Sequence, residues 1–252
     1  MQQMQRIDRL CAIDSLLLVQ PIPANRPTLH LQAETEEAVL DIIDEHQTRD
    51  ALQLAGLRPA RRILFHGPPG TGKTSAAFWL AHALRRRIAC ADAHKLVGSH
   101  MGDSSAAIAK LFEAAQTFDG ILFFDEVDSL GGIRQHGADG ASREMAGMVN
   151  TLMTQMERDK GESILIAATN RRELLDRALL RRFDAVVEFP LPSPRQLFRM
   201  IELDTGMLPL GVRQRIHADA VSQAWSHAEI TTAILRERKR EVLATYGRRA
   251  KK

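Results

Sequence analysis

The sequence predicts an α/β fold with a five-stranded parallel sheet between helices, followed by a small helical domain. Stretches typical of strands and stretches typical of helices alternate through most of the chain. Strict alternation of this kind is typical of a parallel sheet that helices cover on both faces. The strand-like runs are 62–66, 87–91, 121–125, 164–169 and 185–189, and the helical stretches between them are 73–86, 104–118, 141–157 and 173–181.

Prolines mark both ends of the alternating region. Residues 1–33 contain three prolines, and we expect them to form an N-terminal extension that starts as a helical segment. A helix is expected over 34–54, because its apolar residues share one face and Gly56 follows it. After three closely spaced prolines near residue 192, only helical patterns remain. The predicted domains are therefore the extension, an α/β domain over 34–192, and a helical domain with a basic tail over 193–252.

Composition and charge exclude several classes of protein. The 252 residues are 44% hydrophobic, which is enough for a sizeable core, and no apolar run reaches membrane-spanning length. Cys11 and Cys90 show neither disulfide nor zinc spacing, which suits a reducing cytoplasm. The segment 236–252 holds eight Lys or Arg and two Glu, so the rest of the chain is slightly acidic. We expect a solvated helix there rather than a nucleic-acid-binding tail.

The segment GPPGTGKT, residues 67–74, matches the phosphate-binding pattern G-x-x-x-x-G-K-[ST]. Its glycines let backbone N–H groups surround phosphates, and the following helix points its positive end at them. Lys73 is expected to reach the terminal phosphates, and Thr74 to supply a hydroxyl to Mg²⁺. The sequence therefore predicts a P-loop NTPase that uses ATP and Mg²⁺. The predicted nucleotide-binding residues of the loop are Pro69, Gly70, Thr71, Gly72, Lys73, Thr74 and Ser75.

The strand 121–125 ends in two carboxylates, Asp125 and Glu126. Carboxylates at the C-terminal end of a parallel strand face the ligand crevice of an α/β sheet. We expect Asp125 to hold Mg²⁺ together with Thr74, and Glu126 to orient and polarise the attacking water. Apolar strands often end in acidic residues, so the pair predicts catalysis only because a phosphate loop precedes it by about fifty residues.

The order of these motifs resembles that of the AAA+ ATPases, in particular the protein-remodelling clade with its spastin-like and bacterial protease-associated members. GPPGTGKT and FFDEVD match that clade's two nucleotide motifs nearly letter for letter. The resemblance covers about 35–247. It implies an AAA+ module, in which a P-loop α/β domain carries a small helical lid.

The resemblance also implies roles for residues outside these two motifs. IAATN places Asn170 at the family's polar sensor, where its amide would bond the lytic water or the γ-phosphate. LLDRALLRRFD places Arg181 and Arg182 at the arginine-finger positions, which in the family reach the neighbouring subunit's nucleotide. His227 stands at a glycine position of the adenine-flanking segment, where it either narrows the pocket or points outward. Without the motifs, Asn170 would be a turn residue and the arginines a basic helix end.

Residues 96–104 correspond to the loop that lines the central pore in remodelling ATPases. His100 and Met101 occupy its aromatic and apolar positions. Imidazole grips an extended polypeptide less strongly than a larger aromatic ring. The alternative is that this loop contacts no substrate. A second, glycine-rich loop over 131–143 is expected beside the pore.

The resemblance implies a Mg-dependent ATPase that forms a homo-oligomeric ring, expected to be a hexamer, and remodels an unidentified protein substrate or effector partner. Residues 1–33 would then contact that partner. A nucleic-acid switch or loader is the alternative, supported only by the basic C-terminal segment. A non-catalytic scaffold is disfavoured, because every motif residue of the predicted active site is present. We find no Ser/His/Asp or H-E-x-x-H signature, so any effector chemistry would belong to a separate protein.

Overall fold

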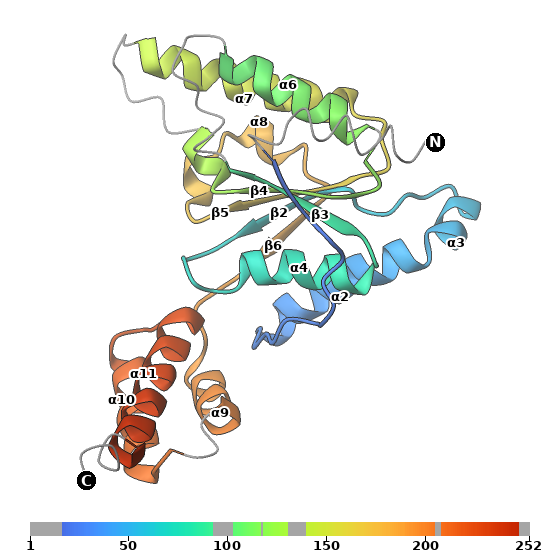
Figure 1. Ribbon diagram of the computed structural model, residues 1–252. Coiled ribbons are helices and arrows are strands. Elements are labelled where there is room, and N and C mark those ends of the chain that lie inside the picture. Colours follow the sequence, from blue (N-terminus) through green and yellow to red (C-terminus); the bar gives the residue numbers. More distant parts are fainter. Residues whose placement is uncertain (1–16, 93–102, 117, 131–139, 205–207, 247–252) are drawn as a thin grey trace.

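The computed structural model describes residues 17–92, 103–116, 118–130, 140–204 and 208–246. Within them, an α/β domain is followed by a separate group of helices (Figure 1). The strands are β1 (Leu17–Gln20), β2 (Arg62–His66), β3 (Arg87–Asp92), β4 (Gly120–Asp125), β5 (Ile164–Thr169) and β6 (Ala185–Glu188). The helices are α2 (Ala33–Gln47), α3 (Arg49–Leu54), α4 (Lys73–Ala83), α6 (Asp103–Ala115), α7 (Gly140–Arg158), α8 (Arg177–Leu180), α9 (Pro194–Asp204), α10 (Leu210–Ser222) and α11 (His227–Tyr246), with 3-10 turns η1 (Val127–Leu130) and η2 (Arg172–Leu174).

All six strands form one sheet in the order β1-β3-β4-β5-β2-β6. The five strands from β2 to β6 pair in parallel, which confirms the sheet predicted from the sequence. The sixth strand, β1, pairs antiparallel with β3 at the edge and sets Leu17 opposite Ala91. The helical expectation was wrong for 17–20, because pairing with the open edge of β3 satisfies this backbone in an extended conformation.

Helices cover both faces of the sheet (Figure 1). On one side lie α2 and α4, and on the other lie α6, α7 and α8. One helix was expected over 34–54, but the structure has two, because the helix is interrupted at Thr48 between α2 and α3. The stretch 173–181 is only partly helical: α8 is a short helix that begins where the Asp176 carboxylate accepts a hydrogen bond from the Ala178 N–H at 2.8 Å.

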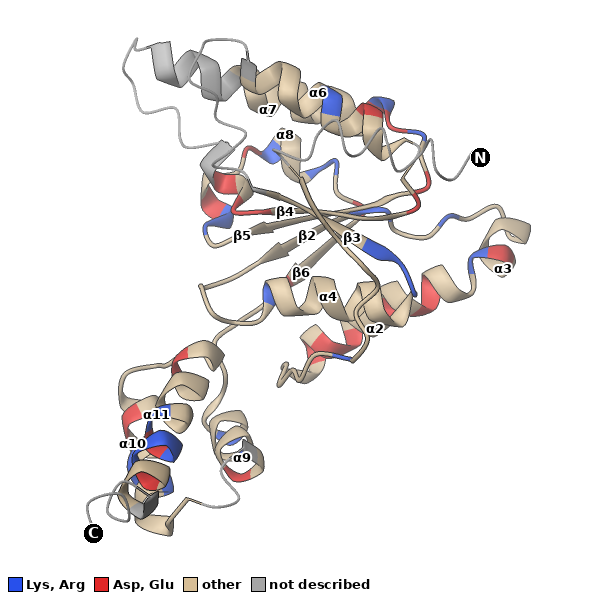
Figure 2. Ribbon diagram, in the orientation of Figure 1, with Lys and Arg blue, Asp and Glu red and all other residues tan. Residues whose placement is uncertain are grey.

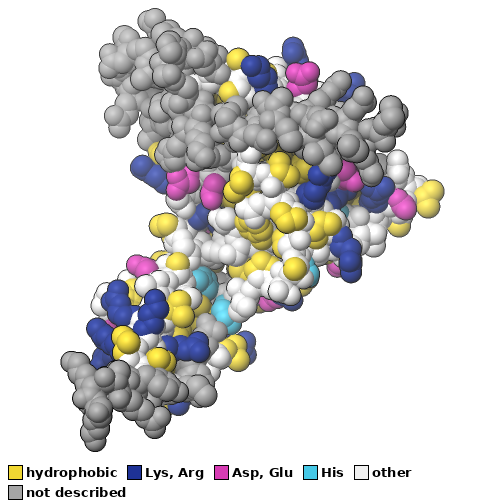
Figure 3. Space-filling model, viewed as in Figure 1, with side chains coloured by type: hydrophobic (Ala, Val, Ile, Leu, Met, Phe, Trp, Pro, Cys, Tyr) yellow, Lys and Arg dark blue, Asp and Glu magenta, His cyan; other side chains and the backbone are white. Residues whose placement is uncertain are grey.

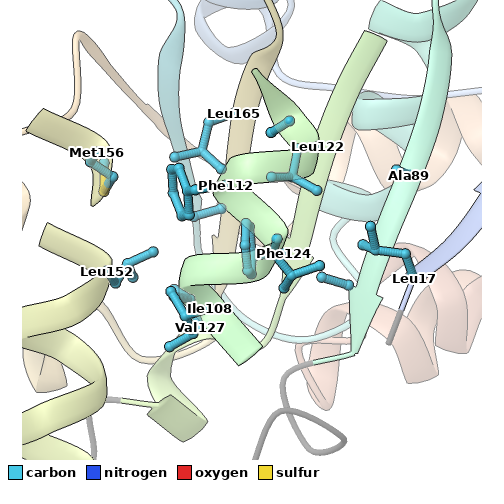
Figure 4. Packing of buried hydrophobic residues seen from close by; sticks show 14 of the residues in the cluster. Leu17, Ala89, Ile108, Phe112, Leu122, Phe124, Val127, Leu152, Met156 and Leu165 are labelled. Carbon is cyan, nitrogen blue, oxygen red and sulfur yellow. The ribbon is translucent and has the colours of Figure 1, made fainter. Parts of the chain in front are cut away.

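Alternate residues of the central strand serve two separate cores. Ile121 and Phe123 pack with α2 and α4, whereas Leu122 and Phe124 pack beneath α6 and α7 (Figure 4). A strand buried on both faces reads as a continuous apolar run, and this is why β4 was visible in the sequence. The helices α9 to α11 have their own core, made by residues such as Met200, Ile216 and Ile230. No helix within the described residues is long and apolar enough to cross a membrane.

Residues 21–32, called the strap below, run from β1 along α4 toward the loop that precedes it. The His82 ring donates a hydrogen bond to the Pro23 carbonyl at 2.8 Å. The Arg26 guanidinium lies 4.2 Å from the centre of the Trp79 ring, a cation–π contact. The strap is therefore held against the α/β domain at several points, and it leads from the edge strand toward the N-terminal end of α4.

Several predicted features lie outside the described residues. They include the two proposed pore residues, His100 and Met101, and most of the second loop, 131–139. The same holds for 1–16 and for the basic end of the chain, 247–252. The site described next is built from the remaining residues.

Candidate nucleotide site

The loop between β2 and α4 has a backbone that only glycine can follow at one position. Gly67 has φ of 143°, and a Cβ built there would lie 2.1 Å from the Phe189 carbonyl oxygen. Any side chain would therefore push the end of β2 away from the residue that follows β6. Since α4 begins at Lys73, the loop lies at the positive end of this helix, where anions are stabilised.

Lys73 is buried and folds back onto its own loop. Its ammonium donates to the Gly67 carbonyl at 2.7 Å, the Pro68 carbonyl at 2.8 Å and the Asn170 side-chain oxygen at 2.8 Å. Burial lowers the pKa of Lys73, while the charges of nearby carboxylates oppose this shift. Phosphate oxygens are acceptors of the same kind, so a nucleotide offers this cation equivalent partners with negative charge.

The carboxyl end of β4 brings a hydroxyl and a carboxylate together. Thr74 Oγ1 donates to Asp125 Oδ2 at 3.1 Å, and the Glu126 N–H donates to Asp125 Oδ1 at 3.0 Å. Glu126 is exposed and has φ of 53°, a conformation that side chains rarely adopt and that occurs often at functional sites. The described residues contain no cluster of three or more His, Cys, Asp or Glu suited to a metal. One hydroxyl and one carboxylate still fit Mg²⁺, which takes most of its ligands from phosphates and water.

Asn170 follows β5 and reaches the same place. Its side-chain oxygen accepts the Lys73 hydrogen bond, so the structure brings the sensor position and the loop lysine into direct contact. Thr169 Oγ1 donates to Asp128 Oδ1 at 2.7 Å and accepts from the Arg171 N–H at 2.9 Å. This pair ties the segments after β4 and β5 together. Sequence reasoning did not assign it, although Asp128 closes the FFDEVD motif.

His66 is a further residue near the phosphate loop that the sequence did not reveal. It is the last residue of β2, is buried, and accepts a hydrogen bond at Nε2 from the Arg172 guanidinium at 3.3 Å. Burial first, and then the positive charges of Arg172 and Lys73, lower the pKa of His66. The imidazole is therefore a neutral acceptor next to the phosphate loop.

A cavity of about 570 Å³ opens beside the loop and extends to the helical domain. One end holds the Lys, Asp and Glu side chains, while the other holds apolar, threonine and histidine side chains. The first end is lined by Pro69, Gly70, Thr71, Gly72, Lys73, Thr74, Ser75, Asp125, Glu126 and Asn170. The second end is lined by Thr28, Leu29, His30, Leu31, Met200, His227, Ala228, Thr231 and Thr232. This division matches a nucleotide, with phosphates at the first end and base and ribose at the second.

The two arginines lie outside this cavity wall. Arg181 is exposed at the end of α8, and its side chain makes no hydrogen bond or ion pair within the described part of the chain. Arg182 donates to Glu157 Oε1 from Nε at 2.9 Å and from Nη2 at 2.6 Å, and to the Ala178 carbonyl. The sequence predicted the same role for both arginines, but in the structure their side chains have different surroundings.

Comparisons with known proteins agree with this geometry. The model of the AAA family, "ATPase family associated with various cellular activities", matches residues 63–191. An uncharacterized AAA family ATPase, y4kL, of Sinorhizobium fredii is 32% identical over 206 residues, covering 82% of this chain and 62% of that protein. A proteasome-activating nucleotidase of Methanoculleus marisnigri is 32% identical over 187 residues, covering 72% of this chain and 45% of that protein. The chain thus spans less than two thirds of the length of these relatives.

Among solved structures, the FIGL-1 AAA domain superposes with a TM-score of 0.68, covering 88% of this chain and 74% of that one. At 20% sequence identity this likeness shows the fold alone. The family match includes both nucleotide motifs, the strand that precedes Asn170 and the segment with the two arginines. It covers half of the chain, which therefore belongs to the AAA family of ATPases.

Proposed function

We propose that this chain binds ATP with Mg²⁺ and hydrolyses it. The proposal rests on one observation: the phosphate loop, the Thr74–Asp125 pair, Glu126 and Asn170 all line the charged end of one cavity. Thr74 and Asp125 would hold Mg²⁺, which neutralises charge on the phosphates when it is bound. The other end of the same cavity, lined by residues 28–31 and the start of α11, would take the base.

The remaining residues have distinct roles in this proposal. Lys73 exchanges its backbone acceptors for phosphate oxygens. Glu126, exposed at the cavity wall, orients and polarises the attacking water. Asn170, released by Lys73, is then available to bond this water or the γ-phosphate.

We further propose a homo-oligomeric ring, most simply a hexamer, that remodels a protein partner in the cytoplasm. The exposure of Arg181, outside the cavity of its own chain, suits a residue that completes a neighbour's site. One heterologous contact that repeats with a closing rotation produces such a ring. The name of the proteasome-activating nucleotidase supports a protein partner.

The alternative is a nucleic-acid switch or loader, and its only support is a basic helix surface. Exposed Arg236, Arg238, Lys239 and Arg240 lie on α11 (Figure 2). Glu237 on the same helix already pairs with Arg215 at 3.3 Å and with Arg240. This partial neutralisation favours the protein-remodelling function.

The test of catalysis uses two substitutions. Hydrolysis of ATP by the purified chain should require Mg²⁺ and should stop when EDTA is added. Lys73→Ala should lose nucleotide binding, whereas Glu126→Gln should keep binding and lose turnover. Hydrolysis by Glu126→Gln at the rate of the unsubstituted chain would refute the role of Glu126.

The test of assembly uses the trapped ATP state. Glu126→Gln with ATP and Mg²⁺ should form a ring that multi-angle light scattering detects. Mixing the inactive Lys73→Ala chain with an inactive chain that lacks both arginines should partly restore hydrolysis. A persistent monomer at high concentration, with no restoration in the mixture, would contradict the ring.

A further inference from the structure

Two hydrogen bonds join the lid, here the helices α9 to α11, to the α/β domain across the cavity. The Ala228 N–H donates to the Gly70 carbonyl at 3.2 Å, which joins α11 to the phosphate loop. The His227 ring, through Nε2, contacts the His30 carbonyl at 2.5 Å, which joins α11 to the strap. Histidine side chains lie where the lid meets the α/β domain (Figure 3). Both bonds belong to the walls that would enclose a nucleotide.

The start of α11 holds His227 in a fixed position. Ser226 is buried, and both its N–H and its hydroxyl donate to Glu229 Oε2, at 2.7 and 2.8 Å. This is a capping box, in which the residue before the helix and the third residue within it satisfy each other. Because His227 is the first residue of α11, this cap fixes the backbone that carries its ring.

The strap holds the other partner of the bond equally well. Leu29 and Leu31 pack against the core that contains Trp79, on both sides of His30. The Gln32 side chain donates to the Leu191 carbonyl at 2.8 Å. The strap therefore presents the His30 carbonyl from a backbone that is anchored before and after it.

The chemistry of this bond fixes the state of the imidazole. A carbonyl oxygen can only accept, so Nε2 of His227 carries the proton. Nδ1 is buried and has no hydrogen-bond partner among the described residues, so a second proton there would be left without an acceptor. Burial, the largest cause, lowers the pKa of His227; the hydrogen bond to the His30 carbonyl opposes this shift, and the charge of the His30 ring adds to it. The contact is therefore made by the neutral ring.

We propose that His227 is a positioning residue that holds the lid against the strap and so forms the base-binding end of the nucleotide site. Residues 28–31 and the first turns of α11 both line that end, and this bond joins the two segments. The phosphate end has its own supports, in Lys73 and the Thr74–Asp125 pair. Loss of this bond should thus weaken the contribution of base and ribose to the binding affinity, while the contribution of the phosphates stays the same.

The experiment compares ATP with inorganic tripolyphosphate, which carries the phosphates without base or ribose. It rests on the proposed function, because both probes are taken to bind at the phosphate loop with Mg²⁺. Dissociation constants are measured for the full chain by isothermal titration calorimetry. His227→Ala should raise the Kd of ATP about tenfold, as expected when a buried partner is left unsatisfied, and should leave the Kd of tripolyphosphate unchanged.

Three further variants make the test specific. His227→Gln keeps a donor near the position of Nε2 and should bind ATP within about threefold of the unsubstituted chain. His227→Asn places its donor closer to the backbone and should lose affinity for ATP as His227→Ala does. If the alanine variant fails to fold, the comparison of the Gln and Asn variants tests the positioning role in its place. His217→Ala is the control, because His217 also bonds a carbonyl, that of Pro194, but within the lid. It should change neither Kd.

The outcomes separate this inference from the proposed function. No binding of ATP by the unsubstituted chain would overturn both. Normal binding of ATP by His227→Ala and His227→Asn would overturn the positioning role alone. An equal loss of affinity for ATP and tripolyphosphate would overturn it too, because the bond would then support the whole site and not its base end.

Discussion

Replacing Arg181 or Arg182 with alanine should have different consequences, because within the described residues Arg182 is held by side-chain contacts and Arg181 is not. Arg182 bonds Glu157 on α7 and the Ala178 carbonyl on α8, and so fixes the end of α8. Arg181 is exposed and has no such contact in the described structure. We therefore propose that Arg181 would contact a neighbour's nucleotide in the proposed ring, and that Arg182 positions this segment.

The contacts of Arg182 give the size of the expected loss of stability, and the usual contribution of arginine fingers gives the size of the expected loss of rate. The side chains of Arg182 and Glu157 are 27% and 56% exposed, and a pair this accessible contributes about 0–1 kcal/mol. With the bond to the Ala178 carbonyl, Arg182→Ala should lower the free energy of unfolding by roughly 1–2 kcal/mol. For a chain of this size each kcal/mol lowers Tm by about 2–4 °C. An arginine finger contributes about 10³–10⁵ in rate, or about 4–7 kcal/mol, which is several times larger.

The assay measures ATP hydrolysis and thermal unfolding on the same samples, at concentrations where the proposed ring would form. Arg181→Ala should lose hydrolysis by about 10³ or more and keep its Tm. Arg182→Ala should lose several degrees of Tm and about tenfold or less in rate. Glu157→Gln should show a smaller loss of Tm than Arg182→Ala, because it removes the charge of the pair but keeps the bond from Arg182 to the Ala178 carbonyl. If Arg182→Ala is as inactive as Arg181→Ala while Glu157→Gln is fully active, Arg182 contacts the nucleotide itself and the assignment is wrong.

Three further predictions concern stability. Gly67→Ala should lower the free energy of unfolding in urea by more than about 3 kcal/mol, because the new Cβ would lie 2.1 Å from a carbonyl oxygen. Gly211→Ala is the control and should be neutral or stabilising, because no atom lies within 4 Å of its Cβ position. Phe124→Ala should cost about 3–5 kcal/mol, because Phe124 is fully buried, and Phe198→Ala, exposed on the lid, should cost far less; a similar loss in both would contradict the core assignment. In the folded chain, burial is the largest cause that lowers the pKa values of three histidines. Below about pH 6.5 the unfolded chain should therefore bind more protons than the folded chain, so Tm should fall as the pH is lowered from 7.5 to 5.5. These histidines are His46, His66 and His227. An unchanged Tm would contradict this reasoning.

The features that the sequence predicted depend on neighbours in the chain. The phosphate loop was visible because its glycines and Lys73 lie within eight residues, and β4 because a strand buried on both faces is apolar throughout. The edge strand β1 was missed because its extended form depends on pairing with β3, about seventy residues later.

Contacts between distant residues could not be predicted in the same way. His227 meets a carbonyl 197 residues earlier in the chain, and the His66 ring meets Arg172, 106 residues later. Neither pairing leaves a local pattern, because each depends on how strands and domains are placed in space. The separation of Arg181 from Arg182 likewise depends on Glu157, which α7 brings alongside α8.

The pairing of β1 with β3 has a consequence for any shortened form of this protein. A chain that begins at residue 34 would keep every nucleotide motif, yet it would lose both the edge strand and the strap. Its β3 edge would present unpaired N–H and C=O groups, which are a template for pairing with strands of other molecules. Such a truncation should aggregate, and what remained soluble should bind nucleotide weakly. Fusions and deletions intended to preserve activity should therefore leave residues from Leu17 onward intact.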